Sequence, residues 1–471
     1  MKKFFFSATT AAVLAALSAG ASAAVDLDTG KTPAKYASEL VVVGSTALKG
    51  AVADVSSTID FGVSTGQTRF IRYDLTNAKF KGTVALGDLS VTGGTPPIVL
   101  GPDIIVVQGG LPDSTFVVFQ ITAKDAIGQD ATVAFKAASG ASGGLVMTTA
   151  GAVQMAYSLY ADPALAAAGG ASGRLNTNFA AQTIASLASG LSFTTVQNTT
   201  IVDVAAATPY TRFILGVGGT STTVAQIGTV SADAAAGVND PTGAAVTYGQ
   251  LVDTGTALVL KGDFGAAAAP STAGTGVYLG VDGGNCGTPG TAPTPATPVA
   301  SAKFTTNAVP VVNRPLCFSL VAANTIQIPT QSFTVELDVT AKAGSTTADA
   351  APIGAGAFNR NGLVLKTAFA ETTTASGVSS TISLTNTTPN VAPFKVRCIL
   401  NSGAVDGTPG SLPANTAQRF SLTSGLGCPS TGTLRGVELT FAVTPGSVIG
   451  SVVRQNTSTG AASFDNMVGN Q

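Results

Sequence analysis

The sequence predicts an all-β protein built from tandem antiparallel β-sandwich (Ig-like) domains with little helix. Apolar residues alternate with polar ones in many short segments, for example at Ile71, Tyr73 and Leu75, and a period of two is typical of half-buried strands. Clusters of turn-forming residues, such as those at 93–97 and 109–113, separate these segments. Because 45% of the residues are apolar, the chain can build hydrophobic cores, which argues against disorder despite its high Gly and Thr content.

We expect four β-rich parts after a cleaved N-terminus. Their predicted ranges are 24–150 for an N-terminal β domain, 151–245 for a second β domain with a short helix, 250–345 and 350–455 for two disulfide-stapled β modules, and 456–471 for a tail. The short helix is predicted because Phe179, Ile184, Leu187 and Leu191 share one helical face.

The two modules are inferred from an internal repeat. Each contains, in the same order, Leu-Val-Leu-Lys, a first cysteine, a Gly-Thr-Pro-Gly turn, a second cysteine and Val-Glu-Leu. These features begin at residues 258, 286, 287, 317 and 335 in the first copy, and at 363, 398, 407, 428 and 437 in the second. Ordered repetition of this kind indicates tandem copies of one fold. The Leu-Val-Leu-Lys segments are expected to be core strands, with Lys261 and Lys366 facing solvent.

The repeat also predicts the disulfide pairing. Four cysteines allow three connectivities, and the repeat selects Cys286–Cys317 and Cys398–Cys428, each inside its own module. In the chain-entropy model, closing a loop of about 30 residues contributes on the order of 3–4 kcal/mol. A four-thiolate zinc site is the competing hypothesis, but the CxxC pairs typical of such sites are absent from the sequence.

The N-terminus has the features of a secretory signal peptide. Two lysines follow Met1, an apolar run extends from 4 to 20, and Ala21-Ser22-Ala23 is a small-x-small cleavage site. We therefore expect residues 1–23 to be removed and the mature chain to be secreted to the extracellular side of a bacterial cell surface. No later window approaches 18 uninterrupted apolar residues, so no transmembrane helix is expected in the mature chain.

The charge balance predicts self-association. Only 10% of the residues are charged and the net charge is −1, and a chain near neutrality lacks the repulsion that keeps monomers apart. We expect a homo-oligomer. A nucleic-acid partner is not expected, because binding one requires a clustered basic face.

Composition also argues against an enzyme. With no histidine in the sequence, Ser-His-Asp and Cys-His arrangements are excluded, although residues 140–144 match the Gly-x-Ser-x-Gly pattern of hydrolases. Acidic residues are scattered and Trp is absent, which disfavours a glycosidase. Asn-x-Ser/Thr sequons occur at Asn198, Asn386 and Asn456, as expected by composition in a chain rich in Asn and Thr.

No cofactor is expected, with calcium as the one exception considered. The segment 26–30, Asp-Leu-Asp-Thr-Gly, resembles the start of a calcium loop, which makes Asp26 and Asp28 candidate ligands. The bidentate Glu that completes such loops is missing, so a surface turn is the favoured interpretation.

In its signal peptide, near-neutral β-rich repeats and Gly/Ala/Thr/Val bias, the chain resembles bacterial surface-layer (S-layer) proteins of the Gram-negative type. The resemblance is one of composition and organisation over the whole mature chain, and no diagnostic motif carries it. It implies a structural protein that self-assembles into a porous protective coat through many weak strand-edge and loop contacts. The four cysteines depart from the S-layer norm of few or none.

Two other functions fit the same features. In a filament or pilus-like subunit, a terminal strand from residues 25–43 would complete the sheet of the next subunit. In an adhesin, the terminal modules would bind carbohydrate or protein.

Overall fold

The computed structural model describes residues 25–29, 32–94, 98, 101–177, 180–203, 210–214, 221–288, 290–306, 308–360, 362–367, 370, 377–430, 434–441, 443, 446–456 and 458–469. The predicted signal peptide, residues 1–23, lies outside them. The described residues form mainly strands and turns, so the predicted all-β class is confirmed. Their helices are short: η1 (Ser38–Leu40), η2 (Ala51–Ala53), η3 (Leu86–Asp88), α2 (Pro163–Ala168) and α3 (Tyr248–Leu251). None of them is long and apolar enough to cross a membrane.

The chain forms two compact units, each assembled from three separate stretches. Unit 1 comprises Met1–Ser192, Asp233–Thr254 and Thr340–Ala348, and unit 2 comprises Phe193–Ala232, Gly255–Val339 and Asp349–Gln471.

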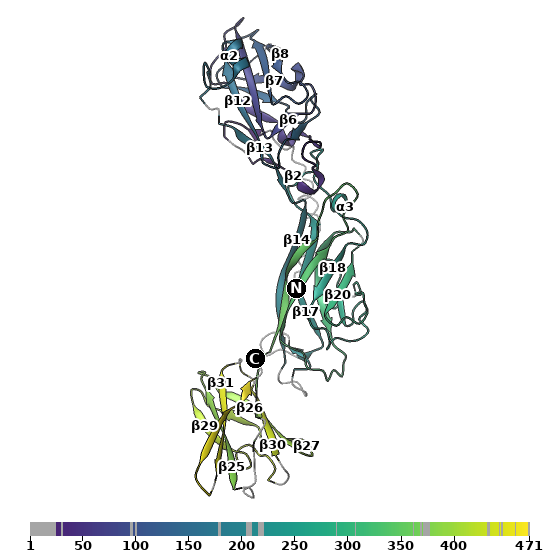
Figure 1. Ribbon diagram of the computed structural model, residues 1–471, viewed down its shortest axis with the longest axis vertical. Helices are drawn as coiled ribbons and strands as arrows, with labels where there is room; N and C mark the ends of the chain where they lie inside the picture. The colour runs from purple at the N-terminus through teal and green to yellow at the C-terminus, as the bar shows by residue number, and fades with distance from the viewer. Residues whose placement is uncertain are drawn as a thin grey trace, which may run out of the picture. The chain divides into compact units, whose positions relative to one another are not determined.

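Unit 1 contains one large and two small sheets, drawn in purple and blue in Figure 1. The large sheet has the order β2 (Ala34–Ala37), β13 (Gln182–Ala188), β12 (Val153–Tyr160), β5 (Thr68–Thr76), β9 (Phe116–Thr122) and β8 (Asp103–Gly109). The second sheet has the order β1 (Val25–Asp26), β4 (Val55–Thr58), β10 (Ala131–Phe135) and β7 (Leu89–Gly93). The third has the order β3 (Ala47–Leu48), β11 (Leu145–Met147) and β6 (Ala78–Phe80).

One hydrophobic core joins the three sheets of unit 1. Tyr73 from β5 stacks on Phe135 from β10 at 4.7 Å, and Phe119 from β9 meets the same ring edge-on at 5.4 Å. Phe80 from β6 approaches it from the third sheet at 6.1 Å. These aromatic side chains point into the core. Because successive side chains on a strand point to opposite faces, the residues next to them point away from the core.

The predicted short helix is wrong, because residues 182–188 form strand β13. A long-range effect explains the difference: β13 pairs with β12 on one side and with β2 on the other, and such pairing overrides a short helical pattern. The helix of this region is α2 instead. Asp162 caps its first turn by accepting hydrogen bonds from the N–H groups of residues 164 and 165, and Pro163 begins it. Phe179, which belonged to the predicted helix, lies outside the described residues.

Unit 2 begins with a ten-stranded sheet. Its main order is β19 (Val277–Leu279), β21 (Val311–Ser319), β17 (Val224–Ala234), β14 (Leu191–Val202), β23 (Ala350–Arg360), β22 (Gln331–Asp338), β18 (Ala257–Lys261) and β20 (Ser301–Thr305). In addition, β15 (Phe213–Ile214) pairs with β14, and β16 (Ser221–Thr222) pairs with β15. Phe358 of β23 packs against Phe213 at 4.9 Å, Phe318 at 5.2 Å and Phe333 at 4.7 Å. Strands of the first cysteine module therefore share one sheet with β14, β17 and β23.

The rest of unit 2, from residue 363 onward, has two sheets with one core between them. The first has the order β27 (Gly403–Asp406), β26 (Ala392–Leu400), β30 (Leu434–Phe441), β24 (Leu363–Thr367) and β33 (Val468–Gly469), with β28 (Gly410–Leu412) also on β26. The second has the order β29 (Ala417–Ser421), β25 (Val378–Asn386), β31 (Val448–Asn456) and β32 (Ala462–Asn466). Leu365 and Val396 of the first sheet share the core with Ile382 and Val452 of the second, so the two sheets pack face to face.

Candidate assembly surfaces

The four cysteines form the two predicted disulfides, Cys286–Cys317 and Cys398–Cys428. Cys317 lies on β21 and Cys398 on β26, whereas Cys286 and Cys428 lie in loops. In the first module, the cysteine on a strand is the later one of its pair, Cys317. In the second module, it is the earlier one, Cys398. Cysteines that correspond in the sequence repeat do not occupy corresponding places in the fold.

The Leu-Val-Leu-Lys segments form buried strands in both modules, as predicted. The segment in β18 pairs antiparallel with β22, with Leu258 opposite Leu337. The segment in β24 pairs antiparallel with β30, with Leu363 opposite Phe441. An unshifted repeat would place Leu363 opposite Leu439, so the two registers differ by two residues. An even shift keeps every side chain on its own face of the sheet.

The lysine that ends each segment forms an ion pair with the glutamate of the Val-Glu-Leu segment. The Lys261 ammonium lies 2.8 Å from the Glu336 carboxylate, and the Lys366 ammonium lies 3.0 Å from the Glu438 carboxylate. Both lysine side chains are nearly half exposed. They lie at the solvent side of core strands, and such exposed pairs contribute at most about 1 kcal/mol each.

The calcium candidates Asp26 and Asp28 lie in the turn at the end of β1. Asp26 accepts hydrogen bonds from the Asp28 N–H at 3.0 Å and from the Thr29 hydroxyl at 2.7 Å, which is the pattern of an Asx turn. Asp28 accepts one from the Thr58 N–H at 2.6 Å. Burial raises the pKa of Asp28 above its ordinary value, although the Thr58 bonds act against it. In the described ranges, no three His, Cys, Asp or Glu side chains are grouped to hold a metal ion, and the calcium hypothesis for Asp26 and Asp28 stays untested.

The Gly-x-Ser-x-Gly match is a tightly held loop. Ser142 is buried, and its hydroxyl donates to a backbone carbonyl at 3.5 Å. Two buried carboxylates that the sequence analysis did not single out fix this loop. Asp54 accepts hydrogen bonds from the N–H groups of residues 138–139, and Asp88 accepts one from the N–H of Ala141. Each precedes a strand directly, at Val55 and Leu89, and an acidic residue before an alternating segment is the signal that points to such a role.

The sequon at Asn386 is part of the fold. Its side chain is 1% exposed, and its amide donates to the carbonyl groups of Asn390, Leu412 and Pro413. Because a buried amide cannot be reached from solvent, this sequon is unsuited to carry a glycan.

Strand β8 is the outermost described strand of the large sheet in unit 1, and it exposes apolar side chains. Ile104 and Val106 face the core, whereas Ile105 and Val107 are 48% and 41% exposed. Its seven residues, Asp-Ile-Ile-Val-Val-Gln-Gly, contain neither Lys nor Pro, the residues that commonly protect a sheet edge. The register on β9 shifts once, between Val106 and Gln108. The strand is therefore an edge with limited protection against pairing with a further strand.

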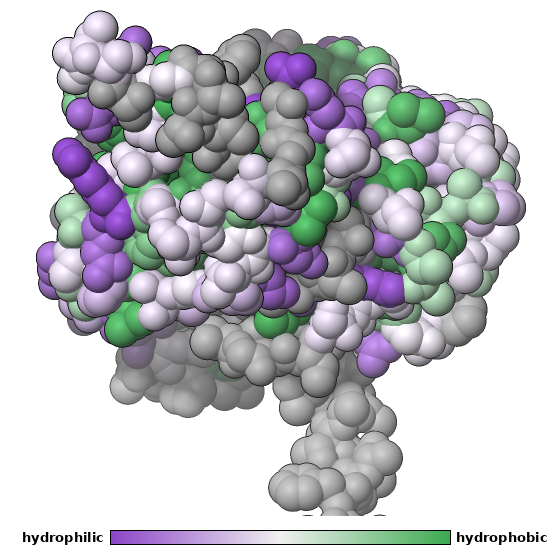
Figure 2. Space-filling view, turned by 90° about the horizontal axis from the view of Figure 1, so that it is seen from below, coloured by the Kyte–Doolittle hydropathy of each residue, from purple (hydrophilic) through white to green (hydrophobic). Residues whose placement is uncertain are grey.

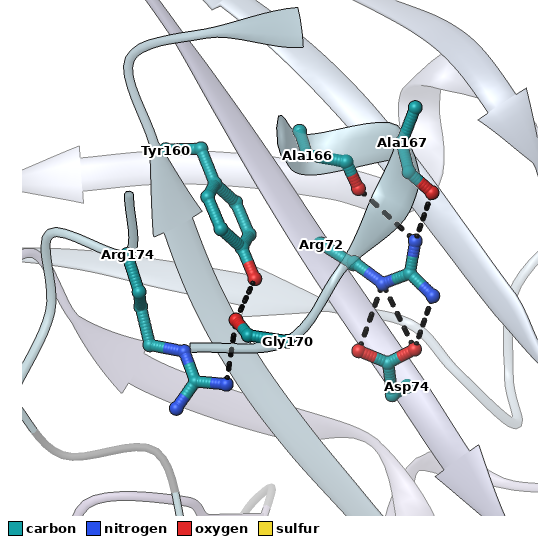
Figure 3. Close-up of polar contacts among 7 residues, drawn as sticks. All are labelled: Arg72, Asp74, Tyr160, Ala166, Ala167, Gly170 and Arg174. Atoms are coloured by element: carbon teal, nitrogen blue, oxygen red, sulfur yellow. Dashed lines mark hydrogen bonds and ion pairs between the residues drawn. The ribbon is translucent and has the colours of Figure 1, made fainter. Parts of the chain in front are cut away.

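The outer face of the same sheet is covered by α2, which Arg72 fastens in place (Figure 3). The Arg72 side chain on β5 donates to both carboxylate oxygens of Asp74 at 2.7–2.9 Å. Its third nitrogen donates to the carbonyl groups of Ala166 and Ala167 at the end of α2, at 3.0 and 2.9 Å. The guanidinium group also stacks over the Phe116 ring at 4.1 Å.

A small second core lies beneath α2. Phe70, Val118 and Tyr160 are buried there together with a helix alanine. The Tyr160 hydroxyl donates to the carbonyl of Gly170 at 2.7 Å, and Arg174 donates to the same oxygen at 2.9 Å, as Figure 3 shows. This arrangement closes the middle of the outer face and leaves the β8 margin exposed.

The chain matches no family model and no curated protein.

The N-terminal segment supplies an edge strand to two sheets of unit 1. Strand β1 pairs with β4 and β2 pairs with β13, both in the parallel direction, whereas the other described pairings in these two sheets are antiparallel. Val25, Leu27 and Tyr36 of the segment are buried. A stretch that folds back from residue 239 holds β2 on its other side, because the N–H of Asn239 donates to the Lys35 carbonyl at 2.8 Å.

The described surface is weakly charged. On the face drawn in Figure 2, pale residues of intermediate hydropathy cover much of the coloured surface, and strongly hydrophilic residues gather in separate areas. With 24 basic and 25 acidic residues in 471, long-range repulsion between copies is weak.

Proposed function

We propose that this is a structural protein, secreted to the bacterial cell surface, where identical copies assemble into an S-layer-like protective coat. The observation that carries the proposal is strand β8, an edge of seven residues that exposes Ile105 and Val107 without a Lys or Pro. An unguarded edge of this kind pairs readily with a further strand. The two disulfides fit an oxidising compartment outside the cytoplasm.

A second copy of this chain is the partner that best fits β8. The single charged residue of the strand, Asp103, is neutralised by Lys124 at 2.6 Å, so two such edges do not repel one another. Antiparallel pairing of β8 with β8 of a second copy is self-complementary, because the same residues face each other across a two-fold axis. Backbone hydrogen bonds would supply affinity and Ile105 would supply apolar contact.

The coat is tested by the variant Ile105→Lys, which places a charge at the centre of the edge. We expect wild-type protein to form regular arrays in negative-stain microscopy and Ile105→Lys to form none. Val299→Lys is the matched control, since Val299 is 74% exposed outside the named strands, and it should assemble normally. Wild-type protein that stays monomeric at high concentration with calcium contradicts the coat. If that monomer binds a glycan array, the adhesin is favoured instead.

The N-terminal segment favours a filament assembled by strand donation as a second candidate. Strands β1 and β2 of this segment each add to the end of a sheet in the parallel direction, and a donated strand likewise adds to a sheet edge. A chain lacking residues 25–37 should remain monomeric and should bind a synthetic 25–37 peptide. Filaments formed by the truncated chain would rule out donation.

A further inference from the structure

The last described residues of the chain, 461–469, form an edge of both sheets of the C-terminal sandwich. We call this segment the C-terminal clasp. Strand β32 pairs antiparallel with β31, and β33 pairs antiparallel with β24. In the described part of the sandwich, β32 is the outermost strand of one sheet and β33 of the other. The clasp therefore crosses from one sheet to the other and closes that side of the core.

The clasp is held by backbone pairing and one buried side chain. The five residues of β32 are exposed, and Phe464 among them is 66% exposed. Val468 of β33 is 70% exposed, whereas Met467, between the two strands, is 7% exposed. Met467 belongs to the core of the sandwich, and its N–H donates to the Gly450 carbonyl at 2.9 Å. Removing the clasp would thus uncover one site, the place that the Met467 side chain fills.

Gly450 shapes that site. A Cβ atom at this position would lie 2.8 Å from the Met467 sulfur and 2.9 Å from Cδ1 of Leu365, which is too close for an unstrained contact. Glycine inside a strand often marks the close approach of another group. Because Gly450, Leu365 and Leu384 lie on β31, β24 and β25, the site is formed by strands outside the clasp, and we call it the Met467 socket.

Charge complementarity adds to the match between the clasp and β31. Arg454 of β31 forms an ion pair with Asp465 of the clasp. Asp465 is the one charged residue in 461–469. A clasp from any copy of the chain would present the same carboxylate, the same methionine and the same backbone pattern.

We propose that the C-terminal clasp is exchanged between copies, so that the clasp of one molecule fills the Met467 socket of the next. The inference rests on the proposed self-assembly and names a second contact, beside β8, that would link the copies. The contacts are the same whether the clasp closes its own sandwich or that of a neighbour, which makes terminal segments a low-cost route to exchange. A clasp passed from each copy to the next is a head-to-tail contact, which extends into an open chain of copies when its rotation does not close into a ring.

An intermolecular cross-link tests the exchange in the full-length protein. Val453 of β31 lies opposite Phe464 of β32. Met467 and Gly450 form a hydrogen-bonded pair, and alternation along the ladder makes Val453–Phe464 a non-hydrogen-bonded pair, whose Cα atoms lie about 4.5 Å apart and can accept a disulfide. The variants Val453→Cys and Phe464→Cys are purified separately, mixed under assembly conditions and oxidised. Exchange predicts a product of twice the monomer mass that is lost on reduction.

Three controls make the result specific. Oxidised at high dilution, before assembly, the double variant Val453→Cys/Phe464→Cys should cross-link within one chain and so shows that the register and the fold are intact. A mixture of Ile449→Cys with Phe464→Cys is off register, although Ile449 is 59% exposed, and should give no more dimer than random collision. Adding Met467→Asp to the Phe464→Cys chain should abolish the intermolecular product.

The outcomes separate the exchange from the coat. If the double variant cross-links internally and the mixture gives no dimer, the clasp stays in its own molecule and the exchange is refuted. Arrays seen by negative stain in that same mixture would leave the coat standing. Cross-linked dimers without arrays would support the exchange and contradict the coat.

Discussion

Nη2 of Arg72 lies 2.7 Å from Oδ1 of Asp74, two positions along the same strand. Because side chains two apart on a strand share a face, the pair forms without help from another strand and leaves Nη1 of Arg72 for the end of α2. One cation thus neutralises a carboxylate and binds a helix terminus on the outer face of the large sheet.

Replacing Arg72 should therefore loosen α2 and leave the large sheet intact. We expect Arg72→Met to lower the free energy of unfolding by about 3 kcal/mol, because Asp74 and two carbonyl groups lose a largely buried partner. Arg72→Lys should recover little, since a lysine cannot form the two-pronged pair. Chemical denaturation measures the loss, and faster proteolysis within residues 161–173 locates it. A change below about 0.5 kcal/mol would contradict this role.

Breaking the second disulfide should weaken the C-terminal sandwich. The loop between Cys398 and Cys428 spans 30 residues, so Cys398→Ser/Cys428→Ser is expected to cost about 3–4 kcal/mol. Hydrogen exchange should rise in β26 and its neighbours. Cys286→Ser/Cys317→Ser is the matched comparison, and its increase should fall in β21 and its neighbours instead. Equal effects of both double variants on both regions would contradict the expectation that each disulfide stabilises its own region.

The stability of the loop with the Gly-x-Ser-x-Gly match should depend on Asp54 and not on Ser142. Asp54 accepts three hydrogen bonds from residues 138–139, and bonds to a charged acceptor contribute about 1.5–3 kcal/mol each. We expect Asp54→Ala to destabilise unit 1 by roughly 3 kcal/mol or more. Ser142→Ala should stay within about 1 kcal/mol of wild type, because the serine makes one long bond. Thermal unfolding of the two variants side by side decides between them.

Protonation of Asp240 should lower the stability of the protein in acid. Burial acts to raise its pKa, but hydrogen bonds from Thr242, Gln250 and Ala244 outweigh it and leave the pKa below the ordinary value of 3.8. A depressed pKa means that the unfolded chain binds the proton more tightly than the folded chain does. The contribution of Asp240 to the free energy of unfolding is therefore complete above about pH 4, and it is lost as the pH falls from there through the lowered pKa of the folded state. Asp240→Asn should flatten the acid limb of an unfolding curve measured from pH 6 to 2. An unchanged limb would show that Asp240 is not its source.

Alternation within short segments was sufficient to predict the all-β class, and the internal repeat was sufficient to predict both disulfides. Alternation such as that of Ile71, Tyr73 and Leu75 depends on two faces of one strand, and the structure buries these side chains on β5. The repeat identified Leu258 and Leu363 as residues of core strands, and both are buried. Both signals are visible in the sequence itself, without knowledge of which strands pair.

Pairings between distant segments could not be predicted. Residues 182–188 became a strand because β2 and β12 lie beside them, and their own pattern contains no sign of either. The apolar run at 104–107 in β8 is typical of a strand but does not indicate that the strand lies at an edge, since edge position depends on which segments remain unpaired. Nor does the spacing of the cysteines reveal that Cys317 and Cys398 are the two strand cysteines.

Unit 1 needs chain from three places, and its last stretch is Thr340–Ala348. A ribosome delivers the N-terminus first, and domains usually fold as they emerge. Here the strands of the three sheets lie between Val25 and Ala188 and can pair early, whereas the stretch that completes the unit, up to Ala348, is synthesised much later. The order of synthesis therefore predicts that unit 1 gains its last contacts, such as the hydrogen bond from the Thr346 N–H to the Glu39 carbonyl, only after most of the chain has been made.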